Sequence, residues 1–295
     1  MNRLALAILA AVAAVGMVLA VTTGPAISAE SEKSDKETTP IPDARVFVSR
    51  HTGTFGGQRV RYTATAGETY LLDDEGEPKA AIFSTAYVRE GVDNPASRPV
   101  TFLWNGGPGS ASMWLHMGGL GPRRVDVPSD AKDDGAPPYP IVDNPLAFLD
   151  ISDVVFIDPV GTGFSRPLGE HEGKEFWGVT EDAESVAEFI RQWISVNGRW
   201  NSPKYIGGES YGTTRAAAVI NQLEGGINDI SVNGIILIST VLDFTYSRFQ
   251  SGNEMSYVAF LPSYAAAAWY HEKVPGGPAR EPGRLSGCGA PVRAH

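Results

Sequence analysis

Cysteine is almost absent from this chain, which has Cys288 as its single example among 295 residues. One cysteine excludes an intramolecular disulfide and a metal cluster built from cysteines, so the hydrophobic core must stabilise the fold without cross-links. Cys288 stands in a stretch rich in Gly and Pro, away from any pattern that would supply a base. We interpret it as incidental rather than as a nucleophile.

Basic residues are also few, with 24 Lys and Arg against 34 Asp and Glu and a formal net charge of −10. Binding to a nucleic-acid backbone depends on clustered Lys and Arg, and no basic stripe is present, so we expect no nucleic-acid partner. The sequence also lacks a phosphate loop, a dinucleotide fingerprint and a zinc pattern, and the acidic group at 73–77 lacks the ligand spacing of a calcium loop. We therefore expect neither a metal nor a cofactor.

A long apolar run occurs at the N-terminus. Arg3 precedes a charge-free stretch over 4–21, a Gly-Pro pair follows, and small residues then lead to Ala29. This pattern predicts a signal peptide over 1–29, cleaved near Ala29, and export to the periplasm or the medium. The stretch is marginally long enough to span a bilayer, so we expect a membrane association only if the segment is retained as an anchor.

Two further segments lack the pattern of a folded domain. Residues 30–44 are rich in Lys, Glu, Ser and Thr and predict a disordered linker. Residues 275–295 repeat Gly, Pro and Arg without apolar periodicity, which predicts a disordered tail or an aberrant sequence from a shifted frame or a truncated gene. The folded domain is therefore expected over 45–274.

Within that domain, two kinds of pattern follow one another. Alternating apolar and polar residues between 45 and 100 predict antiparallel edge strands. From residue 100 onward, short apolar runs alternate with helical periodicity, which predicts an α/β fold with a mostly parallel sheet and helices on both faces. The expected buried strands are 100–104, 153–157, 204–207 and 235–238, and the expected helices are 180–200 and 213–223.

The most informative motif is Gly208-Glu209-Ser210-Tyr211-Gly212. It matches the Gly-x-Ser-x-Gly nucleophile elbow, in which a serine sits on a strained turn between a strand and a helix. The glycines are needed because side chains two positions either side of the serine would collide with neighbouring backbone. A strand is predicted before the motif and a helix after it, which favours Ser210 as a nucleophile over a purely structural turn.

A second glycine-rich string, Asn105-Gly106-Gly107-Pro108-Gly109, directly follows the strand predicted at 100–104. Taken alone, it would be read as a Gly-Pro turn. In combination with the elbow, it predicts an oxyanion hole, because the loop after an earlier strand donates one backbone N–H and the residue after the nucleophile donates the other. The expected donors are Gly107 and Tyr211.

Three blocks, 104–109, 158–165 and 208–212, resemble the signature blocks of serine carboxypeptidases and stand in the same order. The resemblance implies an α/β-hydrolase fold and the release of C-terminal residues from peptides through an acyl-enzyme on Ser210, usually at acidic pH. It also implies that Gly107 and Tyr211 form the oxyanion hole.

The same resemblance assigns a substrate-binding role to Asn105, Gly106 and Glu209. Asn105 and Glu209 match members of the network that binds the terminal carboxylate of the peptide. Glu209 can hold a second carboxylate only when one of the two is protonated, which fits activity on the acid side of neutrality.

The sequence departs from the family pattern at several points. Gly119 stands where the family has the partner glutamate of Glu209, which weakens the expectation of strict carboxypeptidase specificity. Ser110-Ala111-Ser112 replaces a segment in which many relatives have a cysteine, as in a disulfide-free, bacterial-type branch.

The family places its catalytic Asp and His far downstream of the serine, and this chain extends 85 residues beyond Ser210. We expect the α/β-hydrolase domain to be incomplete at its C-terminus and the chain to be weak or inactive as a carboxypeptidase. The downstream alternatives, His271, His295, Asp229 and Asp243, show no pattern of a fixed base and its partner.

His116 and His171 precede the elbow and are expected on the surface or in loops. Two other functions stay open. One is an esterase or acyltransferase on the same fold, and the other is a non-enzymatic pseudoenzyme or binding module.

Overall fold

The computed structural model describes residues 40–127, 135–224, 229–271 and 273–274. The predicted signal peptide, the tail at 275–295 and most of the predicted linker lie outside the described residues. The linker's last residues, 40–44, are described and adopt no regular secondary structure.

The residues just before the first strand are fixed to the second strand of the sheet. The Tyr70 hydroxyl donates to Pro42 O (2.7 Å), and Arg45 donates to the Glu68 carboxylate from its backbone N–H (3.0 Å) and its side chain (3.3 Å). Arg166 Nη1 lies 2.6 Å from the same carboxylate. Burial alone would raise the pKa of Glu68, but these hydrogen bonds and charges outweigh it and lower the pKa to about 2.

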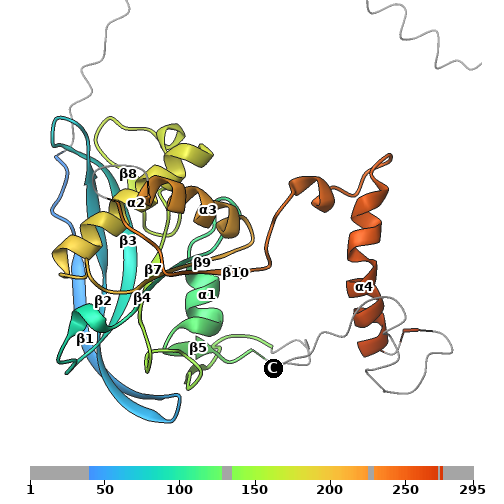
Figure 1. The fold of residues 1–295 in the computed structure, drawn as a ribbon, viewed down its shortest axis with the longest axis horizontal. Helices are drawn as coiled ribbons and strands as arrows, with labels where there is room; N and C mark the ends of the chain where they lie inside the picture. Colours follow the sequence, from blue (N-terminus) through green and yellow to red (C-terminus); the bar gives the residue numbers. More distant parts are fainter. Residues whose placement is uncertain (1–39, 128–134, 225–228, 272, 275–295) are drawn as a thin grey trace, which may run out of the picture. The chain divides into compact units, whose positions relative to one another are not determined.

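One mixed sheet organises the domain, with the strand order β1-β2-β3-β7-β4-β9-β10 and with β8 paired to β3 (Figure 1). The pairs β1/β2, β2/β3 and β3/β7 are antiparallel, whereas β7/β4, β4/β9 and β9/β10 are parallel. The predicted parallel sheet with antiparallel edge strands is therefore confirmed. The strands are β1 (Val46–Phe55), β2 (Gln58–Leu72), β3 (Pro78–Arg89), β4 (Val100–Trp104), β7 (Asp153–Ile157), β8 (Arg166–Pro167), β9 (Lys204–Glu209) and β10 (Gly234–Ile238). A separate hairpin pairs β5 (Arg123–Val125) with β6 (Ile141–Asp143).

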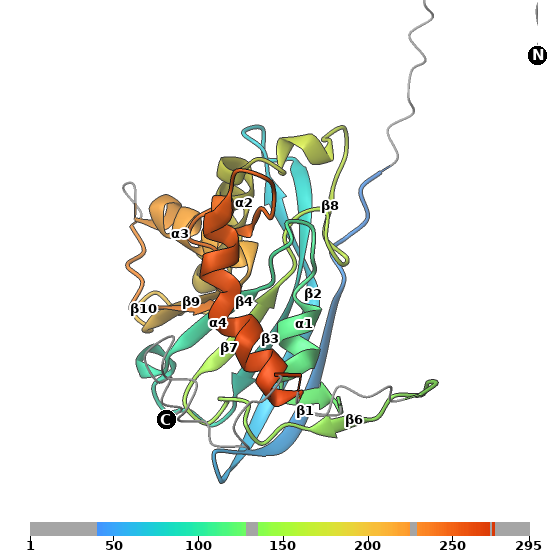
Figure 2. The ribbon, with the colours of Figure 1, turned by 90° about the vertical axis from the view of Figure 1, so that its right-hand side faces the viewer.

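The central strands are buried on both faces, as predicted. Phe102 and Trp104 of β4 pack with α2 (Val179–Val196) and α3 (Tyr211–Leu223) in the larger core cluster. Leu103 faces the opposite way and packs in the second cluster with α1 (Met113–Leu115). Short π-helical structure, η2 (His116–Leu120), continues from α1. Figure 2 shows α3 and α1 on opposite sides of the central strands.

The helices that flank the motifs begin at different residues from those expected. The second helix of the predicted pair, α3, starts at Tyr211, directly after the proposed nucleophile, and β9 extends to Glu209. The first, α2, starts at Val179, one residue before the predicted start at 180, and its first turn has no side-chain cap. Helix α2 ends at Val196, which leaves Trp200 outside it.

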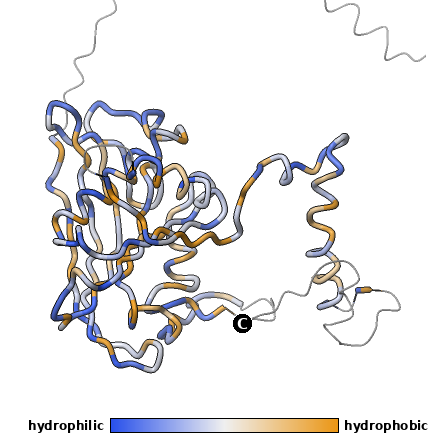
Figure 3. Tube along the Cα trace, in the orientation of Figure 1, coloured by the Kyte–Doolittle hydropathy of each residue, from blue (hydrophilic) through white to orange (hydrophobic). Residues whose placement is uncertain are grey.

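Strand β10 was expected to be buried, and this expectation is wrong for the described residues. Ile235, Ile236 and Leu237 are 44%, 37% and 42% exposed, because β10 is the edge strand of the described sheet and pairs there with β9 alone. Figure 3 shows that the segment is nonetheless apolar. Helix α4 (Glu254–Tyr270) follows and packs on η4 (Phe244–Ser247), where Ser256 Oγ donates to Arg248 O (2.9 Å). Among the described helices, none has the length and apolar character that crossing a bilayer requires.

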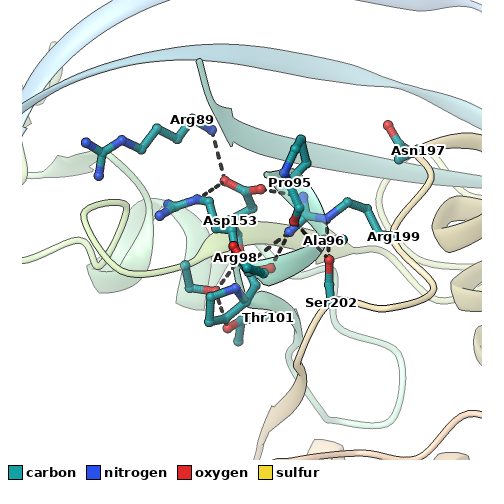
Figure 4. Close-up of polar contacts among 12 residues, drawn as sticks. Arg89, Pro95, Ala96, Arg98, Thr101, Asp153, Asn197, Arg199 and Ser202 are labelled. Atoms are coloured by element: carbon teal, nitrogen blue, oxygen red, sulfur yellow. Dashed lines mark hydrogen bonds and ion pairs between the residues drawn. The ribbon is translucent and has the colours of Figure 1, made fainter. Parts of the chain in front are cut away.

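A buried ionic cluster joins the amino ends of the parallel strands (Figure 4). Asp153, at the start of β7, accepts from Arg98 Nε (2.8 Å), Arg199 Nη1 (2.5 Å) and the Arg89 backbone N–H (2.9 Å). Arg199 Nε donates to the Ser202 hydroxyl (2.6 Å), and the other guanidinium donors reach backbone carbonyls, including Leu149 O (2.7 Å). The cluster therefore stabilises the end of the sheet opposite to the glycine motifs at 105–109 and 208–212.

Candidate active site

The segment around Ser210 forms the strand–turn–helix arrangement that the sequence predicts. Ser210 has φ 57° and ψ −124°, a left-handed conformation that non-glycine residues rarely adopt and that costs free energy. Its N–H donates to Ile238 O at the end of β10 (2.9 Å), and its carbonyl accepts from the hydroxyl of Thr213 (2.7 Å). These bonds hold the strained turn at the carboxyl edge of the sheet.

The glycines around Ser210 allow backbone to touch backbone. A Cβ on Gly208 would lie 2.0 Å from Gly212 O, and one on Gly106 would lie 2.5 Å from both Glu209 O and Tyr211 N. Neither distance is possible for a real side chain. The loop after β4 is thus pressed directly against the elbow, which brings the two predicted glycine motifs together.

Ser210 opens onto a cavity of about 520 Å³. Among the predicted site residues, Asn105, Gly107, Glu209 and Ser210 line this cavity, while Gly106 does not and instead packs under the elbow. The Tyr211 side chain is buried (6% exposed), so only the backbone N–H of this residue, at the start of α3, remains as a candidate oxyanion donor. The full lining is Asn105, Gly107, Ser110, Trp114, Leu115, Glu209 and Ser210.

Asn105 and Glu209 are hydrogen-bonded to each other in the lining of the cavity. Asn105 is 1% exposed, and its Nδ2 donates to Glu209 Oε2 (3.1 Å) while its Oδ1 accepts from the Leu115 N–H (2.9 Å). The bond from Leu115 fixes the orientation of the amide, so that its N–H groups face the carboxylate. A substrate carboxylate placed here would meet one amide donor and one carboxyl group.

The position of the family's second glutamate contains no carboxyl group in this chain. Gly119 lies in η2, with open space around the position of a Cβ, and its carbonyl accepts from Asn144 Nδ2 (2.7 Å). The sequence reasoning missed Trp114, which lines the cavity and is 64% exposed. Its place five residues after Gly109 was the available signal.

The histidines lie in other surroundings. His116 was expected on the surface or in a loop, and this is wrong, because it stacks on Phe156 (4.5 Å between ring centroids) and bonds to the Tyr87 hydroxyl (2.7 Å). Burial lowers the pKa of His116 to about 4. His171 lies in a loop and bonds to Glu175 (2.8 Å), and His271 is exposed at the end of α4. In the described ranges, no three His, Cys, Asp or Glu side chains gather as a metal site.

The block at 158–165 shapes the neighbouring loop. Asp158 Oδ1 accepts from the Ser112 N–H (2.8 Å), and a Cβ on Gly163 would lie 2.1 Å from Asp158 Oδ2. Burial raises the pKa of Asp158, against the opposing effect of its backbone hydrogen bonds. Asp158 therefore ties this loop to the segment after Asn105 and does not line the cavity of Ser210.

Comparison with known proteins agrees with these features. The serine carboxypeptidase family profile matches residues 70–261. Serine carboxypeptidase-like 16 of Arabidopsis thaliana is 27% identical over 172 residues, which cover 55% of this chain and 38% of the relative. Serine carboxypeptidase-like 36 of the same plant is 31% identical over 134 residues, or 45% of this chain and 26% of the relative.

Among solved structures, the prohormone-processing carboxypeptidase Kex1 of Saccharomyces cerevisiae is similar, with 18% identity and a TM-score of 0.47 over 72% of this chain and 48% of that one. The chain spans less than two fifths of the length of the plant relatives named above. Because the family match covers well over half of the chain and the sheet carries the nucleophile elbow, this chain belongs to the serine carboxypeptidase family and has its α/β-hydrolase fold.

Proposed function

We propose that the chain carries the nucleophile, the oxyanion hole and part of the substrate site of a serine-type carboxypeptidase. Ser210 Oγ would attack the carbonyl carbon of the last peptide bond, and the C–N bond would break as the amine takes up a proton. The C-terminal residue leaves, and water then hydrolyses the acyl-enzyme. The observation that carries the proposal is that Ser210, on a strained turn, shares one cavity with the Gly107 loop and the Asn105–Glu209 pair.

Two backbone groups are suited to stabilise the oxyanion that forms in this attack. The Tyr211 N–H lies at the positive end of α3, where the first N–H groups of a helix have no acceptor within it. Gly107 has φ 104°, a conformation that favours glycine and lets the loop backbone approach a substrate carbonyl without a Cβ. Loss of one such donor costs roughly 10²- to 10³-fold in kcat in other serine hydrolases.

The Asn105–Glu209 pair is suited to hold the free carboxylate of a peptide. The Asn105 amide donates, and Glu209 shares a proton with the substrate carboxylate when one of the two is protonated. Peptides with a free C-terminus would therefore bind best at acidic pH. An amidated C-terminus would remove the negative charge that this pair recognises.

Activation of Ser210 also needs a base and a carboxylate that orients it. The family supplies both from further along the chain, and the described histidine after Ser210, His271, is exposed at the end of α4. A missing base typically lowers kcat by roughly 10⁴- to 10⁶-fold. We therefore expect slow acylation of Ser210 in this chain alone.

The test combines covalent labelling with peptide cleavage. Purified protein is treated with a fluorophosphonate and analysed by intact mass, with Ser210→Ala as the matched control. Slow labelling of the parent chain, and none of Ser210→Ala, is expected. Long incubation with a free-acid peptide should release its last residue, whereas the amidated peptide should stay intact. Equal cleavage of both peptides would contradict a carboxypeptidase.

A second candidate function is that of an esterase or acyltransferase. Gly119 has no side chain, so Glu209 is the one carboxyl group in the described lining of the cavity that could bind the C-terminus of a peptide. A site with one carboxyl group in place of two favours this second function. Turnover of simple esters without release of C-terminal residues would support this candidate. A folded sample in which Ser210 resists labelling would instead indicate a binding module.

We also propose export, supported by the sequence pattern over 1–29. Expression of the whole chain in a bacterial host should yield mature protein outside the cytoplasm with an N-terminus near residue 30. Recovery of the uncleaved chain in the cytoplasm would contradict the signal peptide.

A further inference from the structure

We propose that the buried pair of Asp182 and Arg215 positions both oxyanion donors against Ser210. The inference rests on the proposed function, because it concerns the same oxyanion hole. Neither side chain lines the cavity of Ser210, so the pair would act through the residues it holds and not on the substrate.

Arg215 joins three parts of the fold. It lies on α3 and is 2% exposed. Its Nε donates to Asp182 Oδ2 on α2 (2.7 Å), and its Nη1 donates to the backbone carbonyl of Asn105 (2.7 Å). The planar guanidinium thus fixes the start of the Asn105–Gly109 loop relative to two helices at once.

The same pair also holds the second donor residue. The Tyr211 hydroxyl lies 3.4 Å from Asp182 Oδ2, and Arg215 Cζ lies 5.1 Å from the centre of the Tyr211 ring. Asn105 is two residues before Gly107, and Tyr211 supplies the other N–H. Both halves of the proposed oxyanion hole are therefore attached to one ion pair.

The pair lies on the far side of the loop from the nucleophile. Asp182 and Arg215 form part of a second cavity of about 290 Å³, together with Pro108, Gly109 and Trp177. The loop thus has Ser210 on one side and the ion pair on the other. The contacts of the ion pair with this loop matter because a displacement of a catalytic group by about 1 Å can lower the rate roughly 10²-fold.

The chain offers a matched control in Arg191. Like Arg215, Arg191 bridges α2 and α3, since it lies on α2 and donates to Gln222 O on α3. It makes this bridge at the C-terminal end of α3, away from the Asn105 loop. Replacement of Arg191 therefore removes a contact between α2 and α3 and leaves the contacts of the oxyanion loop in place.

The experiment compares Arg215→Lys, the double variant Asp182→Asn/Arg215→Met and Arg191→Met with the parent chain. A single substitution would leave a buried charge without its partner, and such a charge can unfold the protein. The double variant removes both charges and so avoids this effect. A lysine can reach either Asp182 or the Asn105 carbonyl but cannot reproduce the fork that joins them. Urea midpoints first establish that each variant is folded.

Two readouts follow. The first is the acylation of Ser210 by p-nitrophenyl acetate, separated into kcat and KM. We expect kcat to fall by about 10²-fold in both Arg215 variants, with KM nearly unchanged. The second is hydrogen exchange of the amides in 105–109, which should become about tenfold faster in the same variants. Arg191→Met should change neither readout.

A folded Arg215→Lys or double variant whose kcat stays within about threefold of the parent value overturns the inference. So does an equal fall in Arg191→Met, because the effect would then be a general loosening of the helices. If the parent chain is not acylated at all, the proposed function fails. Hydrogen exchange of the amides in 105–109 then still tests whether the ion pair positions the loop. Unchanged exchange in 105–109 would overturn the positioning role independently.

Discussion

Replacement of Gly106 by alanine tests the contact between the oxyanion loop and the elbow. A Cβ at this position would lie 2.5 Å from Glu209 O, 2.5 Å from Tyr211 N and 2.7 Å from Gly212 N. All three neighbours are backbone atoms, which cannot rotate away as a side chain can. Gly106 has no left-handed φ, so alanine causes no backbone strain and the contact alone is perturbed.

The expected effect of Gly106→Ala follows from the lack of space for a Cβ at this position. Ordinary Cβ contacts begin at 3.4 Å, so the loop and the elbow must separate by about 0.9 Å in Gly106→Ala. Overpacking of this kind costs about 1–3 kcal/mol in the free energy of unfolding. The same displacement would move the Gly107 and Tyr211 amides apart, so acylation of Ser210 should slow by roughly 10²-fold.

Urea unfolding and the rate of Ser210 acylation give the two measurements. Gly118→Ala is the matched control, because Gly118, in η2, has no left-handed φ and has nothing within 4 Å of the position of a Cβ. Alanine there should be neutral or stabilising by about 0.5–1 kcal/mol. If Gly106→Ala matches Gly118→Ala in both measurements, the close packing of loop and elbow does not exist.

Two predictions concern stability away from the site. Asp153→Asn leaves two buried guanidinium groups without their carboxylate and should lower the free energy of unfolding by about 3–5 kcal/mol, measured in urea. A change below about 1 kcal/mol would show that backbone carbonyls satisfy both arginines. Glu68 has a folded-state pKa of about 2, below its ordinary 4.5, so its bonds with Arg45 and Arg166 stabilise the fold fully above pH 4.5 and progressively less toward pH 2. The stability gap between the parent chain and Glu68→Gln should narrow over that range, and a constant gap would contradict the ionised state of Glu68.

Much of the local structure could be predicted from the sequence. The apolar runs located β4 and β7 to the residue, because short strands buried on both faces have an unmistakable composition. The glycine motifs predicted the turn at Ser210, since few sequences place a serine between two such glycines after a strand. These signals are local, so they can be read without knowledge of the rest of the fold.

The errors arose where the environment depends on distant parts of the chain. His116 is partly buried because Tyr87 and Phe156, from strands β3 and β7, pack against it. Asp182 lies in the first turn of α2, where a carboxylate favours the helix dipole, yet it is buried with Arg215, 33 positions away. Polar residues in helices give no local indication of such partners, and only the packing of α2 on α3 brings these two together.

The catalytic arrangement depends on a register that no motif encodes. Strands β4 and β9 are parallel neighbours, and Trp104 pairs with Gly208, so Asn105 and Glu209 leave the sheet side by side and bond at 3.1 Å. A slip of one residue would turn one of these two side chains to the other face of the sheet. The elbow and the oxyanion loop would then face different cavities, even with every glycine in place. The chemistry proposed for Ser210 therefore requires the pairing of these two strands as much as it requires the serine itself.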